Sequence, residues 1–328
     1  MIWVTPTYND IRLGFEVTCY INVRWCWCYS TTFFKRYMTV LILTKEKTED
    51  YETTKLIKSF SDKNIPVRVC YFSKFDVIIN LGILYDGELL DNPEIVLVRL
   101  GAGITRAELS VIRYFELQNI PCFNSSESIN IVQDKFQSSE ILAASGVAVP
   151  HSMIIKQNTR HDTVKNTIGF PCIVKVVVGS FGEGIYLCQT EKEYINLIEF
   201  VDAVHNEKTL IAQEYLGDRP GEDLRVFVVG DKVIGAMKRT APEGDFRANI
   251  THGGTGEQYV VSKEIEDIAL KTAKVLDLSI AGIDLLFDKR GFRVCEANSN
   301  PGFSGFDKFC NADIANEITE FLINKLNK

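Results

Sequence analysis

The amino-acid sequence predicts an α/β protein with an α+β portion, and two patterns carry that prediction. From Met38 onward, short apolar runs typical of buried strands alternate with amphipathic stretches typical of helices, which favours a layered α/β domain. From Thr209 onward the strand-like runs become longer, and the dipeptide Gly230-Asp231 joins two of them as a tight hairpin. With 328 residues, 46% of them hydrophobic, the chain is long enough for two or three cores.

The first predicted lobe is a small α/β domain that spans residues 38–125. Residues 105–118 have the spacing of a helix, which begins with Thr105 and has Glu108 three residues later, the pattern of a capping box. The dipeptide Asp86-Gly87 favours a hairpin turn. The other predicted elements of this lobe are a helix at residues 50–60 and strands at residues 39–43, 67–71, 76–80 and 95–99.

Two further lobes are expected at residues 126–206 and 207–328. The second lobe begins with one helical stretch at residues 126–145, which ends at Gly146. Its other predicted elements are strands at residues 153–155, 172–178 and 184–187 and a helix at residues 191–203. The third lobe is predicted to contain strands at residues 210–215, 223–229, 232–238, 280–287 and 293–298 and helices at residues 263–276 and 312–326.

Residues 1–37 do not fit this alternation, and we expect them to be a poorly ordered extension outside the fold. Their aromatic and cysteine-rich run at residues 19–34 is interrupted by Arg24, and no basic segment precedes a clean apolar core. A signal peptide is therefore not expected. An upstream translation start is one interpretation of the extension, and a role at a membrane surface stays open.

Composition excludes several classes of function. The net charge of -7 argues against a general nucleic-acid binder, which would carry a clustered basic excess. No run of about 18 apolar residues is present, so no spanning helix is expected. The nine cysteines lack paired metal-ligand spacing, and Cys172, Cys188 and Cys295 lie in apolar runs as expected for buried thiols. This usage fits a reducing compartment, and we expect a cytoplasmic protein.

Three oxygen-bearing side chains near the C-terminal end form the main candidate site. Asp284 lies in the middle of an apolar strand-like run, where an unpaired carboxylate would cost several kcal/mol. Glu296 and Asn298 are two residues apart, so a strand presents both on one face, with Cys295 and Ala297 on the other. A short connection typical of a hairpin separates the two runs. Antiparallel pairing therefore places Asp284 beside Glu296 and Asn298.

The chemistry of this set suits a hard metal ion. Carboxylate and carboxamide oxygens are ligands that Mg²⁺ prefers, with phosphate and water completing its octahedron. Charges solvated at strand ends are the alternative interpretation. One such residue would fit that alternative, but three on one face with apolar flanks favour a metal site.

Lys175 is a second anomaly, because all its neighbours in sequence are apolar. Such a lysine either extends its amino group to solvent or meets a buried anion. A glycine-rich loop follows, which could bring backbone N–H groups against phosphate, although ordinary turns also look like this. The loop residues expected to contact phosphate are Gly179, Ser180, Phe181 and Gly182. Lys135 taken alone would be interpreted as a surface lysine.

Further polar residues occur at the ends of the predicted strands. A strand ending in Gln213, Glu214 and Tyr215 could present backbone groups to an adenine edge, as could many strand exits. Asp223 and Arg225 alternate on one strand face, and Lys238 and Arg239 end the next strand.

A segment rich in glycine completes the candidate residues. Arg247 and Asn249 precede the run at residues 251–256, which also contains His252. Arginine binds phosphate or carboxylate through two parallel hydrogen bonds, so this segment indicates anion handling. A purely structural loop is the alternative.

Together these residues resemble the ATP-grasp superfamily and, more closely, its RimK-like branch of glutamate ligases. The resemblance covers Met38 to the C-terminus. The motifs that carry it are Lys135, residues 175–184, residues 213–215, residues 244–249, and the set Asp284, Glu296 and Asn298. Residues 296–315 are also similar to N-acetylaspartylglutamate synthetases. The implied fold is a three-lobed ATP-grasp fold with an N-terminal pre-grasp α/β domain.

The resemblance also implies a role for each matching position. Lys135, Lys175 and the glycine loop would hold ATP phosphates, and Gln213, Glu214, Tyr215 and Asp223 would line the adenine and ribose pocket. Arg239, Arg247 and Asn249 would contact phosphate and the acyl-phosphate intermediate. Asp284, Glu296 and Asn298 would bind one or two Mg²⁺ or Mn²⁺ ions, and Arg99 would lie near the acceptor site.

The implied function is an ATP-dependent, ADP-forming carboxylate–amine ligase. It would join glutamate or a similar amino acid to a carboxylate on a peptide, a protein C-terminus or a small molecule, without nucleic-acid or membrane partners. A homo-oligomer is left open. The alternatives are an ATP-binding module without turnover, or another ATP-grasp reaction such as acid–thiol ligation or phosphorylation.

Overall fold

A computed structural model of the chain describes residues 40–45, 50–101, 103–156, 159–177, 184–204, 209–248 and 253–327. The predictions made for residues 1–37 lie outside these ranges. Within them, no helix combines the length and apolarity needed to cross a lipid bilayer.

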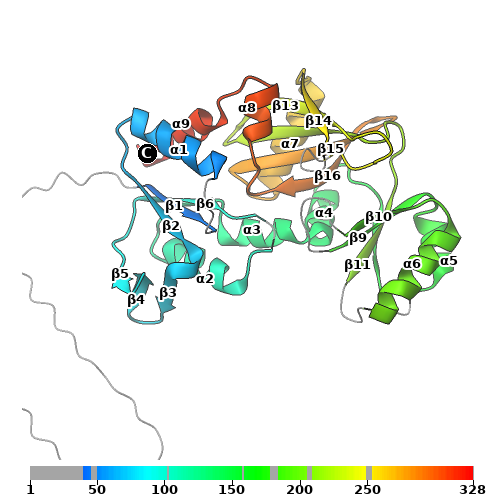
Figure 1. The fold of residues 1–328 in the computed structure, drawn as a ribbon, viewed down its shortest axis with the longest axis horizontal. Coiled ribbons are helices and arrows are strands. Elements are labelled where there is room, and N and C mark those ends of the chain that lie inside the picture. Colours follow the sequence, from blue (N-terminus) through cyan, green and yellow to red (C-terminus); the bar gives the residue numbers. More distant parts are fainter. Residues whose placement is uncertain are drawn as a thin grey trace, which may run out of the picture. The chain divides into compact units, whose positions relative to one another are not determined.

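A parallel sheet forms the first layer, with strand order β2-β1-β6-β7 (Figure 1). Its strands are β1 (Val40–Thr44), β2 (Val67–Tyr71), β6 (Ile95–Arg99) and β7 (Cys122–Phe123). All residues of β1 and β6 are buried, as their apolar sequences require. Its helices are α1 (Tyr51–Asp62) and α2 (Arg106–Leu117). The capping box of Thr105 and Glu108 is present, which confirms the predicted start of α2.

A small antiparallel sheet follows β2, after the 3-10 turn η1 (Phe72–Lys74). It consists of β3 (Phe75–Ile78), β4 (Gly82–Tyr85) and β5 (Glu88–Leu89). The turn between β4 and β5 is Asp86-Gly87, and both residues have positive φ angles, 57° and 84°. This confirms the predicted hairpin, because a two-residue turn of this hand needs residues that tolerate positive φ.

The helical stretch predicted at residues 126–145 is wrong in one respect, because it consists of two helices. These are α3 (Ser126–Gln133) and α4 (Lys135–Ala144). Asp134 between them is extended, and its carboxylate accepts hydrogen bonds from the backbone N–H groups of Phe136 and Gln137. An aspartate that caps a helix competes with helix continuation, so the chain breaks here. Lys135 thereby becomes the first residue of α4.

A second antiparallel sheet has the strand order β10-β9-β11-β8. Its strands are β8 (Ser152–Ile155), β9 (Cys172–Val176), β10 (Ile185–Cys188) and β11 (Leu210–Glu214), and its helices are α5 (His161–Thr167) and α6 (Glu191–Val204). Helix α5 was not predicted, because this short polar helix buries only Val164. The buried Cys172 and Cys188 confirm the prediction for those two thiols.

The largest sheet has five antiparallel strands in the order β14-β13-β12-β15-β16. They are β12 (Glu222–Val229), β13 (Lys232–Thr240), β14 (Thr255–Tyr259), β15 (Ile280–Asp288) and β16 (Gly291–Asn298). The remaining helices are α7 (Lys263–Val275), α8 (Ser304–Phe309) and α9 (Ile314–Leu326). Neither β14 nor α8 was predicted. The edge strand β14 includes the end of the run interpreted as a glycine-rich loop.

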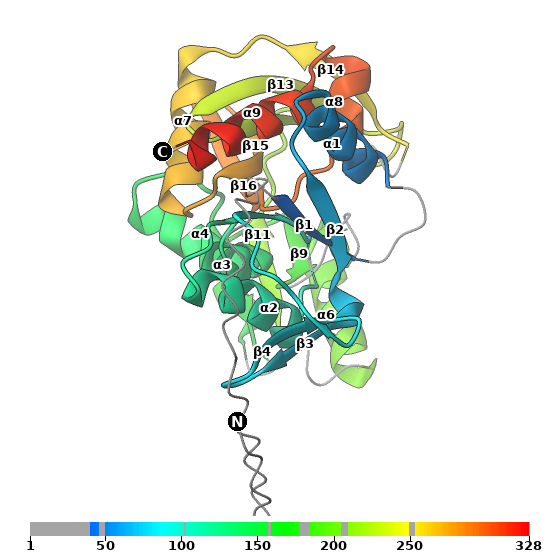
Figure 2. The same ribbon diagram turned by 90° about the vertical axis from the view of Figure 1, so that its left-hand side faces the viewer.

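Each face of the five-stranded sheet contributes to a different core. Along β12, Val226 and Val228 pack into a cluster that includes residues of α7, whereas Phe227 and Val229 pack into a cluster with α9. The second cluster also contains Val40 and other residues of β1 and α1. Helices α1 and α9 accordingly lie side by side in both views (Figures 1 and 2). This shared core fixes the parallel sheet against the lobe that carries the candidate metal residues.

Candidate functional site

The predicted pairing of the metal-site residues is confirmed. Strands β15 and β16 form a hairpin closed between Asp288 and Gly291. In this register Asp284 lies opposite Glu296, and Gly282 lies opposite Asn298. The three candidate ligands therefore come from adjacent positions on two neighbouring strands.

A β-bulge corrects the prediction for Cys295. The register shifts between Asp284 and Leu285, so that Leu285 pairs with Val294 and Cys295 is the extra residue. Ala297 packs into the core as predicted. Cys295 instead lies among charged groups of the candidate site, which influence its pKa, and its side chain is half-buried rather than buried as predicted. Strict alternation of side chains fails where a residue is inserted, and the sequence does not mark the insertion.

Asp284 is the centre of a buried network of charges. Its carboxylate accepts two hydrogen bonds from Arg225, at 2.7 Å from Nε and 2.5 Å from Nη2. Arg239 Nη2 lies 3.0 Å from the same carboxylate, and Arg239 also donates to Asp223 from both Nε and Nη2. Asp284 is 3% exposed and Arg239 is 4% exposed, so this pairing compensates charges that water hardly reaches.

The network decides the protonation of its members. Burial raises the pKa of Asp284, but Arg225 and Arg239 more than offset burial and lower it to about 2. Burial opposes the charge of Arg239, while Asp284 and Asp223 outweigh it and raise the pKa of that guanidinium. Burial raises the pKa of Asp223 despite its contact with Arg239. Asp284 is thus the firmly ionised carboxylate.

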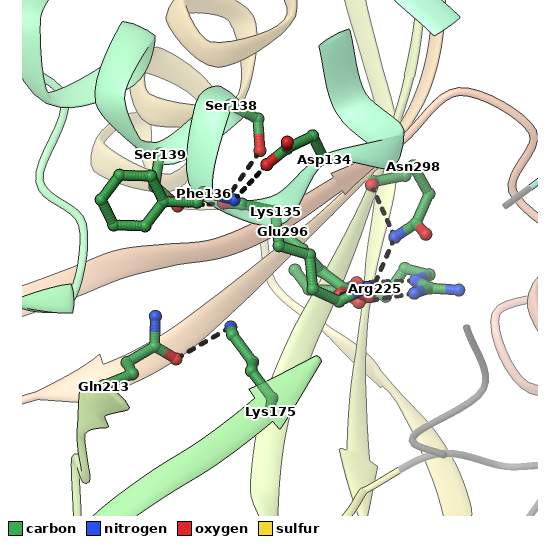
Figure 3. Close-up of polar contacts among 12 residues, drawn as sticks. Asp134, Lys135, Phe136, Ser138, Ser139, Lys175, Gln213, Arg225, Glu296 and Asn298 are labelled. Atoms are coloured by element: carbon green, nitrogen blue, oxygen red, sulfur yellow. Dashed lines mark hydrogen bonds and ion pairs between the residues drawn. The ribbon is translucent and has the colours of Figure 1, made fainter. Parts of the chain in front are cut away.

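Glu296 and Asn298 lie at the edge of this network (Figure 3). The Asn298 amide nitrogen is 3.4 Å from Glu296 Oε1 and 3.4 Å from the carbonyl oxygen of Gly282, and neither contact uses the amide oxygen. Lys135 Nζ lies 3.7 Å from Glu296 Oε2. The first residue of α4 therefore reaches the candidate metal residues, which the sequence alone could not show.

Lys175 is buried, and it is 4% exposed. Its amino group donates to Gln213 Oε1 at 3.1 Å (Figure 3). The Gln213 amide nitrogen donates in turn to Ser152 Oγ at 2.8 Å. A neutral amide oxygen compensates a buried ammonium only in part. Lys175 also lowers the pKa of Cys295, the residue before Glu296, so the two groups are close enough for their charges to interact.

Glu214 connects two lobes through its side chain. Arg293 of β16 donates to the Glu214 carboxylate and, at 2.8 Å, to Asp288. The Glu214 carboxylate also accepts from the backbone N–H of His151, whose carbonyl accepts from the Glu214 N–H. Tyr215 follows directly, and burial raises the pKa of its hydroxyl.

Not every predicted residue is brought to this cluster. Arg247 pairs with Asp245, two residues earlier, through both carboxylate oxygens. Arg99 lies at the end of β6 and contacts Pro301. The predictions for Gly179, Ser180, Phe181, Gly182, Asn249 and His252 fall outside the residues that the structure describes.

Three residues of the site escaped the sequence analysis as functional candidates. They are Arg225, Cys295 and Arg293. The sequence did show Asp223 and Arg225 on one strand face. The available clue was therefore an arginine two residues from Asp223, which was predicted to line the nucleotide pocket. The roles of Cys295 and Arg293 depend on a bulge and on a contact between lobes, which no local pattern encodes.

The assembled groups can hold a polyphosphate together with a hard cation. Within the described ranges, no three or more His, Cys, Asp or Glu residues form a ready-made metal cluster. The set Asp284, Glu296 and Asn298 offers two carboxylates and one amide, a donor set that suits Mg²⁺ when phosphate and water complete it. Lys135 and Lys175 lie beside it as the cations that phosphate oxygens require.

Comparison with known proteins agrees with this arrangement. The solved structure of ATP-grasp ligase PsnB complexed with a phosphomimetic variant of its minimal precursor, Mg and ADP superimposes with a TM-score of 0.68. The match covers 88% of this chain and 98% of that chain at 22% identity, so the likeness concerns the fold. Fold and site together define an ATP-grasp protein.

Family models identify the branch. The RimK-like ATP-grasp domain matches residues 132–322, and the RimK PreATP-grasp domain matches residues 38–129. The chain belongs to the RimK-like ATP-grasp family. A model of the PqqA family matches residues 3–20, outside the described residues.

Curated relatives extend over nearly the same length. A protein of Maridesulfovibrio salexigens named probable alpha-L-glutamate ligase is 32% identical over 291 residues, which is 87% of this chain and 95% of that protein. One of the same name from Vibrio atlanticus is 34% identical over 289 residues, with the same coverage. The similarity of residues 296–315 to N-acetylaspartylglutamate synthetases stays a prediction.

Proposed function

We propose that the chain is an ATP-dependent ligase that joins the amino group of glutamate, or of a similar amino acid, to a carboxylate. The observation that carries the proposal is the approach of Lys135 to the paired set Asp284, Glu296 and Asn298, in a chain of the RimK-like ATP-grasp family. The buried Lys175 supports it as a second cation, because its charge acts on Cys295 beside Glu296. The names of its relatives support glutamate as the amino acid. A peptide acceptor is supported by another structure of PsnB, which is complexed with precursor peptide PsnA2 and AMPPNP.

In the proposed reaction the acceptor carboxylate attacks the γ-phosphorus of ATP, which forms an acyl phosphate and releases ADP. The amine of the second substrate then attacks the acyl carbon, an amide bond forms, and phosphate leaves. Phosphoryl transfer depends on positioning and charge neutralisation more than on covalent help from the protein. Lys135 and Lys175 hold phosphate oxygens, and Glu214 and Tyr215 line the adenine pocket.

Asp284, Glu296 and Asn298 are the residues that would hold Mg²⁺. When bound, the metal neutralises charge on the phosphate oxygens. Arg239 is held between Asp223 and Asp284, and this fixed guanidinium is suited to stabilise the oxyanion that forms when the amine attacks. The lobe boundaries in this proposal are 38–125, 126–206 and 207–328. The proposed location is the cytoplasm, because the cysteines that the structure describes are free thiols, as expected in a reducing compartment.

A screen for ADP release tests the proposal. Purified protein, MgATP and pairs of amino acids and carboxylate acceptors are combined, and mass spectrometry identifies the product. Glutamate-dependent ADP release with a product one amide bond larger is expected. ADP release without an amide product would favour a kinase, and nucleotide binding without ADP release would favour a module without turnover.

The metal assignment is tested by Asp284→Asn and Glu296→Gln. Each should reduce ADP release at least 100-fold, the range seen when a group that stabilises transition-state charge is removed. Asp231→Asn serves as the matched control, since Asp231 is exposed at the hairpin between β12 and β13. Circular dichroism verifies folding. Normal ADP release by folded Glu296→Gln would refute the assignment.

A further inference from the structure

Arg99 is a buried cation without an anionic partner among the described residues. It ends β6, and its side chain is 7% exposed. Nη1 and Nη2 each lie 3.4 Å from the carbonyl oxygen of Pro301, and the guanidinium carbon is 5.6 Å from the centre of the Phe303 ring. Nε is buried and has no hydrogen-bond partner among the residues that the structure describes. Such a charge is costly unless an anion binds to it.

The nearest carboxylates do not fill that role. Glu52 accepts hydrogen bonds from the backbone N–H groups of Phe303 and Ser304, at 3.1 and 3.3 Å. Asp50 accepts from the side chain of Thr53. Both act on Arg99 at longer range, and no ion pair within 4.0 Å joins either of them to its guanidinium. Arg99 therefore keeps donors available.

A second unpartnered atom belongs to the segment that Arg99 contacts. Asn300 Oδ1 is buried and accepts no hydrogen bond from the described residues. Asn300 precedes Pro301, the residue that Arg99 touches. Its side chain also faces the segment after Arg99, because a methyl group placed on Gly101 would lie 3.9 Å from Asn300 Nδ2. Donor and acceptor thus come from two chain segments that meet at one place.

We propose that Arg99 and Asn300 form a substrate subsite that binds a carboxylate together with an adjacent N–H group, as found at the main-chain end of an amino acid. The guanidinium binds the carboxylate through parallel hydrogen bonds, and Asn300 Oδ1 accepts the N–H. A phosphate group would satisfy Arg99 but would leave the acceptor of Asn300 unpaired, which disfavours the nucleotide as the ligand. The subsite rests on the proposed ligase function and specifies how that ligase recognises its amino-acid substrate.

The position of the subsite agrees with such a role. Asn300 follows Asn298 by two residues, so the subsite uses the chain segment that leaves the proposed metal residues. Arg99 comes from the parallel sheet, which shares its core with the five-stranded sheet. A free amino acid and the C-terminal residue of a peptide acceptor both present this chemistry.

Calorimetric titration of the full chain, saturated with MgADP, tests the subsite without turnover. The probes are L-glutamate and the dipeptide alanyl-glutamate, each paired with its α-amide, which lacks the terminal carboxylate. One or both of the carboxylate probes should bind to wild type. Arg99→Gln should lower the affinity for such a probe at least tenfold and leave the affinity for its amide unchanged. Arg99→Lys should fall between wild type and Arg99→Gln, because an ammonium keeps the charge but not the paired geometry. Asn300→Ala should weaken the same probe severalfold.

Arg68→Gln is the matched control, since Arg68 is an exposed arginine of the same sheet whose guanidinium carbon lies 5.2 Å from the centre of the Tyr85 ring. It should bind every probe like wild type. An unchanged affinity for MgADP verifies that the Arg99 variants are folded. Equal affinity of wild type and Arg99→Gln for both probes, or binding of neither probe to wild type, would overturn the subsite. If wild type binds the probes as expected but releases no ADP in the screen described above, the result would count against the proposed function and not against the subsite.

Discussion

At the scale of single residues, the environment of each charge decides what its side chain can do. Asp284 and Glu296 are both carboxylates on paired strands, yet Asp284 is bound by two guanidiniums and Glu296 faces an amide and a lysine. The first is fixed and ionised, whereas the second has fewer fixed partners. We therefore expect unequal contributions of the two carboxylates to the proposed metal binding.

Acid should destabilise the wild-type protein through Asp284. Its pKa is about 2 in the folded protein and 3.8 for an ordinary aspartate, so its stabilising contribution is complete above pH 4 and disappears as the pH falls through 2. The free energy of unfolding in urea should fall by roughly 2 kcal/mol more for wild type than for Asp284→Asn between pH 4.5 and pH 2. Parallel pH profiles of the two proteins would contradict this.

The thiol of Cys295 should be inert at neutral pH. Burial raises its pKa to about 11, with a further contribution from Glu296 that Lys175 opposes. The thiolate is the reactive form, so iodoacetamide should modify Cys295 at pH 7.5 at least 100-fold more slowly than in urea. Mass spectrometry of the peptide that contains Cys295 measures the rate. Comparable rates with and without urea would show that the bulge leaves the thiol exposed.

At the scale of elements, the residue at which a helix begins determines which side chains reach the candidate site, just as strand pairing does. The break at Asp134 starts α4 at Lys135, whose backbone N–H also donates to the carbonyl of Val177 at 3.2 Å. A continuous helix would not leave Lys135 at a helix N-terminus, where donors and positive potential favour anions. The cap therefore links local sequence to the proposed phosphate site.

Asp134→Ala should reduce both stability and nucleotide affinity. Loss of the cap should cost about 1 kcal/mol in the free energy of unfolding, and the misplaced start of α4 should weaken ADP binding severalfold. Ser125→Ala is the matched control, because Ser125 caps α3 through the N–H of Ser128. It should lose similar stability and keep its ADP affinity, as measured by urea unfolding and calorimetry. Equal effects of the two variants on ADP affinity would refute the link.

Local sequence patterns predicted some of the helices and strands but not others. The strands β2 and β6 and the capped helix α2 follow their predictions because an apolar run or a capping box is a local property. Helix α5 and strand β14 did not stand out, because neither shows a strong apolar face in sequence. The pairing of Asp284 with Glu296 was predictable from a short hairpin, whereas the bulge at Cys295 was not.

At the scale of the whole molecule, single side chains connect segments that lie far apart in the sequence. Arg293 of β16 binds Glu214 at the end of β11, and Lys135 of α4 approaches Glu296. Such contacts depend on the final packing of distant segments, which explains why the predicted residues could be named from motifs while their partners could not.

Arg293→Gln should weaken nucleotide binding more than it affects stability. The ion pair with Glu214 is partly exposed, so its loss should cost no more than about 1 kcal/mol in the free energy of unfolding. Glu214 lines the proposed adenine pocket, and ADP affinity should fall three- to tenfold. Arg290→Gln, at the exposed turn of the same hairpin, should leave ADP affinity unchanged. Calorimetry distinguishes the two, and a similar loss in both would exclude a role for the contact with Glu214.

The pairing of Asp284 with two arginines implies an order of loading. The charges of Asp223, Arg225, Arg239 and Asp284 cancel, so a divalent ion that arrives alone must displace a guanidinium and leave it without a counterion. A nucleotide supplies phosphate oxygens that can take the place of the carboxylate. Metal and nucleotide should therefore be thermodynamically linked, each raising the affinity of the other by the same factor. The empty protein would then discriminate against free Mg²⁺ and accept it as the magnesium–nucleotide complex.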